Sequence, residues 1–225
     1  MKTKERIINA ACELFNEHGE RAITTNHIAS YLGISPGNLY YYFRNKEQII
    51  RAIFSEYETY LSESYGTLPS AGSLMQDYLD NMFQGMWRFR FLYASLADIL
   101  SRDQALHKRY LTAQQRVLAT GVGRLELLVE HQIMQIEPAM MQPLAEGIKM
   151  VVTFWISHLY TQNADKPITE SMVYQGVVQV LVLLHGYITP EFKGDFNALM
   201  SHYRGLVDAP SDVPLARDPQ LQRIL

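Results

Sequence analysis

The segment TTNHIASYLGISPGNLYYYFRNK, near the N-terminus, constrains the fold of this chain more than any other stretch. Ile28 and Leu32 are four residues apart, and this spacing predicts a short helix with one buried face. Thr24 or Thr25 supplies the N-cap hydroxyl of that helix. Gly33 follows where a residue in the left-handed conformation ends a helix. The chain is therefore expected to turn sharply after one short helix.

A second short helix is expected directly after the turn. Ser35 caps it, and Pro36 takes its first position, where a missing N–H costs nothing. Leu39 and Phe43 are again four residues apart and face inward. Asn45 then caps a third helix. Two short helices joined by a tight turn that contains glycine are typical of a helix-turn-helix.

The outer face of the second helix indicates a nucleic-acid partner. Three consecutive tyrosines, at 40–42, have hydroxyls that donate to phosphate oxygens. Gly37 lets the backbone approach the bases, and the Asn38 amide pairs with a base edge or a phosphate. Thr25 donates to a phosphate from the preceding helix, and Lys46 adds a charge beside a helix N-terminus, which is itself an anion site. Ordinary amphipathic packing of the tyrosines is the alternative.

Residues 1–55 together resemble the DNA-binding domain of the TetR family of bacterial transcriptional regulators. The resemblance implies a three-helix DNA-binding domain, a helical ligand-binding domain and a dimer. Pro36 departs from the family pattern, which often has lysine or another polar residue there. The matching residues are Ile7, Ala11, Leu14, Phe15, Gly19, Thr24, Thr25, Ile28, Ala29, Gly33, Ser35, Gly37, Leu39, Tyr40, Tyr42, Phe43 and Lys46. The family's DNA contacts then fall on Thr25, Ser35, Pro36, Gly37, Tyr40, Tyr41, Tyr42 and Lys46.

The distribution of charge agrees with a DNA-facing module on an acidic body. The 225-residue chain has a net charge of −3, which by itself argues against a general nucleic-acid binder. Residues 1–55 carry seven Lys/Arg and five Asp/Glu, whereas the remainder carries 13 basic and 18 acidic residues. With 48% hydrophobic residues, the chain has enough apolar side chains for one or two compact domains.

Cellular location is also constrained by the sequence. The N-terminus has no long apolar run, so we do not expect it to be a signal peptide. The longest apolar stretch, near 177–184, is shorter than the roughly twenty residues that span a bilayer. Cys12 is the single cysteine, so we expect no intrachain disulfide and interpret it as a small core residue. We expect a cytoplasmic protein without a membrane partner.

The remaining pattern predicts an all-α fold. We expect a helix-turn-helix DNA-binding domain over 1–48, a helical ligand-binding and dimerisation domain over 49–206, and a loosely ordered tail over 207–225. The N-terminal helix, which precedes the helix-turn-helix segment, is expected to be capped by Thr3 and closed by Gly19. The further helices are expected over 46–65, 73–89, 89–101, 104–135, 141–162, 169–188 and 190–205, with a loop at 67–73 and a break at Pro138.

Two of these helices indicate self-association. The helices at 141–162 and 169–188 contain stretches that are apolar nearly all round, so each is buried on more than one side. Pairing them with their copies in a four-helix bundle across a two-fold axis would bury both faces. The family resemblance assigns the dimer interface to the same pair. A core within one chain is the alternative. A symmetric dimer favours a palindromic operator.

Large and soft side chains of the middle helices favour a ligand pocket, although most such stripes are simply core. A lining of this kind suits a small, mainly apolar or aromatic effector. The candidate lining residues are Met82, Phe83, Met86, Trp87, Phe91, Tyr93, Tyr110, Phe154, Trp155 and His158.

The expected function is a ligand-responsive DNA-binding regulator, most simply a repressor that its effector releases. The alternative is a DNA-bound structural or scaffolding protein without a small ligand. No enzyme motif is present: the seven histidines form no metal-type pair, and the sequence has no GxSxG elbow or P-loop. We therefore expect no catalytic residue, no metal and no cofactor.

Overall fold

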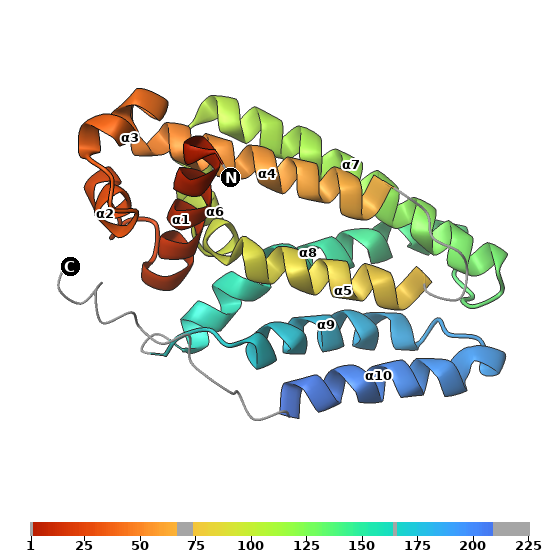
Figure 1. Cartoon of the computed structure of the whole chain (residues 1–225). Helices are drawn as coiled ribbons and strands as arrows, with labels where there is room; N and C mark the ends of the chain where they lie inside the picture. The colour runs from red at the N-terminus through yellow and green to blue at the C-terminus, as the bar shows by residue number, and fades with distance from the viewer. Residues whose placement is uncertain (1, 67–73, 164–165, 209–225) are drawn as a thin grey trace.

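The computed structural model describes residues 2–66, 74–163 and 166–208, and this part of the chain is built from α-helices (Figure 1). The expected loop at 67–73 and the expected tail after 208 lie outside the described residues. The helices are α1 (Thr3–His18), α2 (Thr25–Tyr31), α3 (Pro36–Tyr42), α4 (Lys46–Gly66), α5 (Leu74–Arg88), α6 (Arg90–Arg102), α7 (Gln104–Glu130), α8 (Pro138–Gln162), α9 (Glu170–His185), the 3₁₀ turn η1 (Pro190–Phe192) and α10 (Lys193–Asp208).

Helices α1 to α3 form a three-helix head at one end of the molecule (Figure 1). The Thr24 hydroxyl accepts from the His27 N–H at 3.3 Å, and the Thr24 N–H donates to His27 Nδ1, so the two residues cap α2 reciprocally. Gly33 has a φ of 64°, as expected for the left-handed turn before α3. Ile28 and Leu39 are fully buried and hold the two short helices together.

Helix α4 belongs to both the head and the body. Figure 1 shows it leaving the head and running along the body beside α7. Asn45 caps it by accepting from the Gln48 N–H at 3.0 Å. Arg51 on α4 donates to Asp103 at 2.5 Å, and the same carboxylate caps α7 through the Leu106 N–H. One ion pair therefore ties α4 to the junction between α6 and α7.

The body is a bundle in which α8 packs against α6, α7 and α9, and α10 packs on α9. Gly176 on α9 allows close approach of α8, because a Cβ at this position would lie 2.6 Å from the Trp155 ring. The loops after α7 and α9 pair through an isolated bridge between Met134 and Ile188. These contacts explain why the apolar stretches of α8 and α9 are buried on one side within the chain.

Helix boundaries differ from the sequence expectation at a few ends. Lys2, rather than Thr3, occupies the N-cap position of α1. Helix α7 ends at Glu130 rather than near 135, because the chain turns there into the bridge, with Gln132 at a positive φ of 60°. Pro138 starts α8 instead of breaking a helix, since proline is tolerated at the first helical position.

Candidate nucleic-acid interface and internal cavity

The outward face of α3 is set by what its inward face buries. Leu39 and Phe43 pack into the head, and the Ser35 hydroxyl caps the helix by accepting from the Asn38 N–H at 3.2 Å. This register turns two aromatic rings toward solvent: Tyr41 is 83% exposed and Tyr40 is 46% exposed. Large exposed rings on a well-anchored helix indicate a contact surface rather than packing. Ser35, Pro36, Gly37 and Asn38 are also exposed, while Thr25 and Tyr42 are half-buried.

The tyrosines of this face are held in place before any partner arrives. The Thr25 hydroxyl and the Tyr40 hydroxyl are hydrogen-bonded at 3.1 Å, which joins α2 to α3. Tyr41 and Tyr42 meet edge to face with their ring centroids 5.0 Å apart. Thr25 on α2 and Tyr40 on α3 are therefore joined at the surface of the head.

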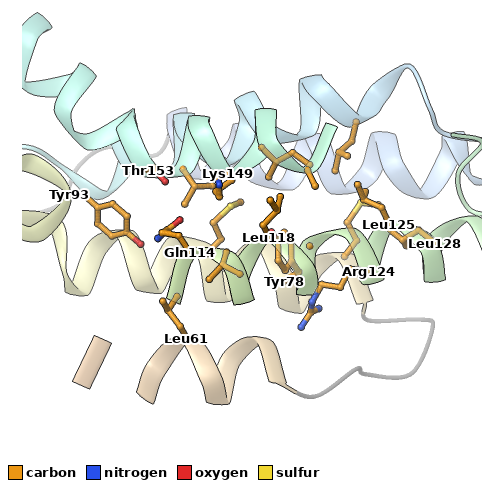
Figure 2. Close-up of a pocket in the computed structure, with 18 of the residues that line it drawn as sticks. Leu61, Tyr78, Tyr93, Gln114, Leu118, Arg124, Leu125, Leu128, Lys149 and Thr153 are labelled. Atoms are coloured by element: carbon orange, nitrogen blue, oxygen red, sulfur yellow. The ribbon is translucent and has the colours of Figure 1, made fainter. Parts of the chain in front are cut away.

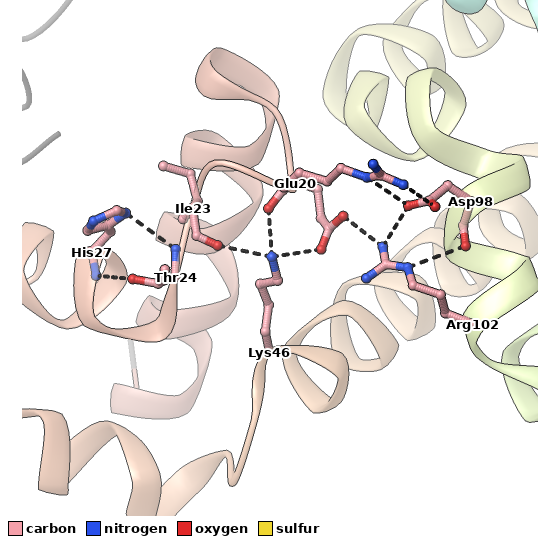
Figure 3. A network of polar contacts seen from close by, with 8 residues as sticks. Glu20, Ile23, Thr24, His27, Lys46, Asp98 and Arg102 are labelled. Carbon is pink, nitrogen blue, oxygen red and sulfur yellow. Dashed lines mark hydrogen bonds and ion pairs between the residues drawn. The ribbon is translucent and has the colours of Figure 1, made fainter.

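Lys46 is placed differently from the other predicted contact residues. Its ammonium donates to the carbonyl oxygens of Glu20 at 2.8 Å and Ile23 at 3.1 Å, and it lies 2.9 Å from the Glu20 carboxylate (Figure 3). Glu20 and Ile23 belong to the loop between α1 and α2, so the ammonium holds this loop in place. The ammonium thus has a structural role inside the head, which the sequence pattern did not indicate.

Glu20 connects the head to the body. Its side chain is fully buried, and Arg102 at the end of α6 lies 2.8 Å from its second carboxylate oxygen (Figure 3). Arg102 also pairs with Asp98, which in turn binds Arg21. A buried carboxylate needs such partners, since an unpaired one is strongly disfavoured in a low-dielectric interior. The network fixes α6 against the loop that precedes α2.

A second contact between head and body involves the side of α1. The Asn16 amide donates to the Arg88 carbonyl at 2.8 Å and accepts from the Phe91 N–H at 3.0 Å. Phe15 packs on Phe91 with ring centroids 5.1 Å apart. Cys12 lies beside them, and burial raises the pKa of its thiol to about 12, so the thiol stays protonated and behaves as a small packing residue.

An internal cavity lies between the body helices (Figure 2). Its volume is about 70 Å³, and α4 to α9 all contribute to its wall. Tyr57 and Leu61 come from α4, the helix that continues into the head. The other described lining residues are Met75, Tyr78, Met82, Tyr93, Gln114, Val117, Leu118, Gly121, Arg124, Leu125, Leu128, Ala145, Ile148, Lys149, Val152, Thr153 and Leu184.

Of the ten candidate pocket residues, Met82 and Tyr93 line this cavity. The other eight lie elsewhere because large side chains also fill the core and cover exposed faces. Phe83 stacks on Tyr174 with centroids 3.8 Å apart, and Trp155 donates to the Met172 carbonyl. Met86 and Phe91 are core residues, Trp87 and Tyr110 are half-buried outside the cavity, and Phe154 and His158 are exposed.

The sequence reasoning missed most of the polar lining of the cavity. Thr153 is buried although it lies in the middle of an apolar helix, and Gln114 and Lys149 face the same cavity. A buried polar side chain within an apolar stretch is the signal that points to such a site. Large aromatic side chains are a weaker guide because they occur throughout any helical core.

The faces of α8 and α9 that point away from the chain are unusually apolar. Met150 is 62% exposed and Phe154 is 57% exposed on α8, and Tyr160 follows on the same helix. Val182 and Leu183 are exposed on α9. Exposed apolar residues on neighbouring helices are characteristic of a protein-protein contact.

The described part of the chain also bears on metal binding and on membrane insertion. No group of three or more His, Cys, Asp or Glu side chains there is arranged to hold a metal ion. Within the same residues, none of the helices combines the length and the apolar character needed to cross a membrane.

Two family models match the chain in succession. Residues 7–53 match the model described as bacterial regulatory proteins of the tetR family, and residues 55–196 match the model described as a bacterial transcriptional repressor. The first match covers the head and the start of α4, and the second covers most of the body. The boundary between the two matches lies within α4, the helix that belongs to both the head and the body.

Individual relatives give the same assignment. The tetracycline repressor protein class D of Escherichia coli is 30% identical over 115 residues, which is 51% of this chain and 51% of that protein. The regulator UidR of Escherichia coli K12 is 45% identical over 51 residues, 23% of this chain and 26% of that protein. The aligned part of the chain thus spans about half the length, or less, of these curated relatives.

A solved structure extends the similarity to nearly the whole chain. The TetR-family transcriptional regulator from Marinobacter aquaeolei VT8 is 37% identical, with a TM-score of 0.81, and the match covers 90% of this chain and 99% of that one. Members of this family are transcriptional regulators rather than enzymes. The chain belongs to the TetR family of bacterial transcriptional regulators.

Proposed function

We propose that this chain is a ligand-responsive repressor that binds a palindromic operator as a dimer and is released by a small, mainly apolar or aromatic molecule. The observation that carries the proposal is the pair of Tyr40 and Tyr41 rings, held outward on a helix whose opposite face is fully packed. Anchored tyrosines of this kind donate to phosphates along a major groove. The name of the tetracycline repressor supports repression as the sign of regulation.

The proposed DNA contacts lie on α2 and α3. Ser35, Pro36 and Gly37 at the start of α3 approach the bases, and Asn38 reads a base edge or a phosphate. Thr25, Tyr40, Tyr41 and Tyr42 bind the flanking phosphates. For Lys46 we propose an indirect contribution, since its ammonium already has three oxygen partners that position the loop before α2.

Dimerisation would give the repressor its operator geometry. We propose that the exposed apolar residues of α8 and α9 pack against their copies across a two-fold axis, with Phe154 and Val182 in the contact. Two heads related by this axis would enter major grooves about 34–36 Å apart, or a multiple of that distance. An inverted repeat in the DNA matches this symmetry.

Effector binding would act through α4. Tyr57 and Leu61 of this helix form part of the cavity wall, so a molecule in the cavity touches the helix that carries the head. A volume of about 70 Å³ is small beside the roughly 300–1,000 Å³ of typical ligand pockets. An effector would therefore favour an arrangement with α4 displaced, and the spacing of the two heads would change.

The cavity also bears on the alternative function. A structural or scaffolding protein without a small ligand has no use for a cavity that touches α4, so the cavity favours the ligand-responsive repressor. The number of genomic sites separates the two: a repressor occupies one or a few operators, whereas a scaffolding protein occupies many dispersed sites.

Binding to DNA from upstream of the chain's own gene tests the proposal. Fluorescence anisotropy at several salt concentrations should give saturable binding that survives an excess of unrelated competitor DNA. Tyr41→Ala should weaken this binding. Weak binding that is equal on any DNA and falls steeply with salt would contradict a local repressor.

A further inference from the structure

The charged side chains described in the cavity wall all carry a positive charge. The described lining residues include two cations, Arg124 on α7 and Lys149 on α8, and contain no Asp or Glu. Arg124 is only 7% exposed, and its guanidinium lies over the Tyr78 ring at 5.0 Å from the centroid. A cationic wall without lining carboxylates favours a negatively charged occupant over a neutral or cationic one.

Polar side chains gather at one end of the cavity. Figure 2 shows the Tyr93 hydroxyl, the Gln114 amide, the Thr153 hydroxyl and the Lys149 ammonium close together, from α6, α7 and α8. The Tyr93 hydroxyl also lies 3.2 Å from that of Tyr57. Burial raises the pKa of Tyr57 to about 12, so its phenol stays neutral and keeps its proton for hydrogen bonding near neutral pH.

The other end of the cavity is lined mainly by apolar side chains, and Arg124, which donates to the Ser64 carbonyl at 3.4 Å, lies beside them. Leu118, Leu125 and Leu128 follow one another along α7 toward that end in Figure 2. Met75 and Met82 also line the cavity, and methionine side chains adapt readily to an irregular occupant. An alkyl chain or an aromatic ring is the group that such a wall accommodates.

Lys149 is the cation best placed to receive an anion. It is half-buried, and the ion pairs among the described residues do not include it. Its neighbours at the cavity end are Gln114, which also hydrogen-bonds Tyr57, and Thr153, which also hydrogen-bonds Tyr110. Each carries a donor group that suits an oxygen acceptor. An ammonium and two neutral donors around one space match a carboxylate or another compact acidic group.

We propose that the cavity binds an amphipathic organic anion, with its acidic head group at Lys149, Gln114 and Thr153 and its alkyl or aryl body along the leucine-lined end. The proposal rests on the proposed function, because it names the chemical class of the effector of that same site. The head group would lie beside the Tyr57–Tyr93 hydroxyl pair, which joins α4 to α6. A bound acid would thus lie directly against α4, the helix that carries the head.

Calorimetric titration of the full chain, without DNA, tests the proposal with three probes that share one tail: octanoate, octanol and octylammonium. The wild type should bind octanoate about tenfold more tightly than octanol, the order expected for one charge-assisted hydrogen bond. Octylammonium should bind most weakly, because the cations of the wall repel its positive charge.

Variants at Lys149 locate the head group. Lys149→Met keeps the apolar stem and removes the charge, so it should abolish the preference for octanoate and leave octanol binding unchanged. Lys149→Arg should retain the preference. Lys108→Met is the matched control, since Lys108 is an exposed residue of α7 that does not line the cavity, and it should behave as the wild type.

Three results would overturn the proposal: octanol binding as tightly as octanoate, an octanoate preference that survives Lys149→Met, or no binding of any probe up to its solubility. Operator binding, measured separately without probe, keeps this proposal distinct from the proposed function. Octanoate binding by a chain that ignores every operator would contradict the repressor alone. Operator binding without octanoate preference would contradict the effector class alone.

Discussion

Single residues of the head divide into those that we propose to face DNA and those that hold the proposed DNA-facing surface in place. Tyr41 belongs to the first group, because its ring is exposed and contacts only Tyr42 among the aromatic residues described. Lys46 belongs to the second, because its ammonium is surrounded by oxygens of the α1–α2 loop. Substitution of Tyr41 should therefore impair DNA binding, whereas substitution of Lys46 should lower stability.

Tyr41→Ala should weaken operator binding without changing the melting temperature. The loss of a hydroxyl–phosphate hydrogen bond is worth about 1 kcal/mol per recognition helix, so the two helices of a dimer should give about a thirtyfold rise in Kd. Tyr41→Phe removes the hydroxyl alone and should reproduce most of the effect. Anisotropy and circular dichroism measure the two quantities, and a large fall in melting temperature would show that Tyr41 packs instead.

Lys46→Met should destabilise the head by about 1–3 kcal/mol, because it leaves the buried Glu20 carboxylate with one cation fewer. Urea unfolding measures the loss. Pairing the change with Glu20→Gln removes the buried charge and should restore part of the stability. An unchanged unfolding midpoint in Lys46→Met would mean that its ammonium is free for DNA.

At the scale of helices, short-range chemistry made the head predictable and the body only partly so. Thr24, Ser35, Pro36 and Asn45 act on neighbouring backbone atoms, so their capping roles followed from the sequence. The cavity depends on which face of each long helix turns inward, and that is decided by contacts between distant segments. The sequence therefore does not identify Gln114, Thr153 and Lys149 as cavity residues, whereas the size of Phe83 and Phe154 suggests a pocket that these two side chains do not line.

The link between α4 and α7 should make stability depend on pH. Arg51 holds the pKa of Asp103 below its usual value of 3.8 in the folded chain. A lowered folded-state pKa contributes stability above the unfolded-state pKa, and this contribution is lost as the pH falls through the folded-state value. Asp103→Asn keeps a capping side chain but removes the ion pair.

Urea unfolding between pH 7 and pH 3 checks this expectation. Asp103→Asn should be less stable than the wild type at pH 7, and the difference should shrink toward pH 3. Asp195→Asn, at an exposed carboxylate in the first turn of α10, serves as the control and should change little. A difference that stays constant with pH would contradict the role of the ion pair.

At the scale of the whole molecule, α4 connects three parts: the head, the α6–α7 junction and the cavity. Helix α4 starts at the head, pairs with Asp103 at the α6–α7 junction, and contributes Tyr57 and Leu61 to the cavity. Helices α8 and α9, which carry the exposed Phe154 and Val182, belong to the body (Figure 1). In the proposed dimer, this arrangement would couple occupancy of the cavity to the spacing of the two heads.

Phe154→Asp should turn the dimer into a monomer. The two-fold axis places the new carboxylate in the interface twice, and each unpaired buried charge should raise the dimer Kd at least about tenfold. Light scattering after gel filtration measures the mass. Leu111→Asp, at a leucine on α7 that is 50% exposed against 57% for Phe154, should leave the dimer intact. A Phe154→Asp variant that remains dimeric would show that the interface lies on another surface.

The most direct test of the account is selection of bound sequences from random double-stranded DNA by the full chain at physiological salt. A dimer of helix-turn-helix heads should enrich one inverted repeat whose half-sites are about one helical turn apart, or a multiple of it. Tyr41→Ala and Phe154→Asp should both lose that enrichment. Failure of the wild type to enrich any sequence, or enrichment of a single unpaired half-site, would contradict a dimeric operator-binding repressor.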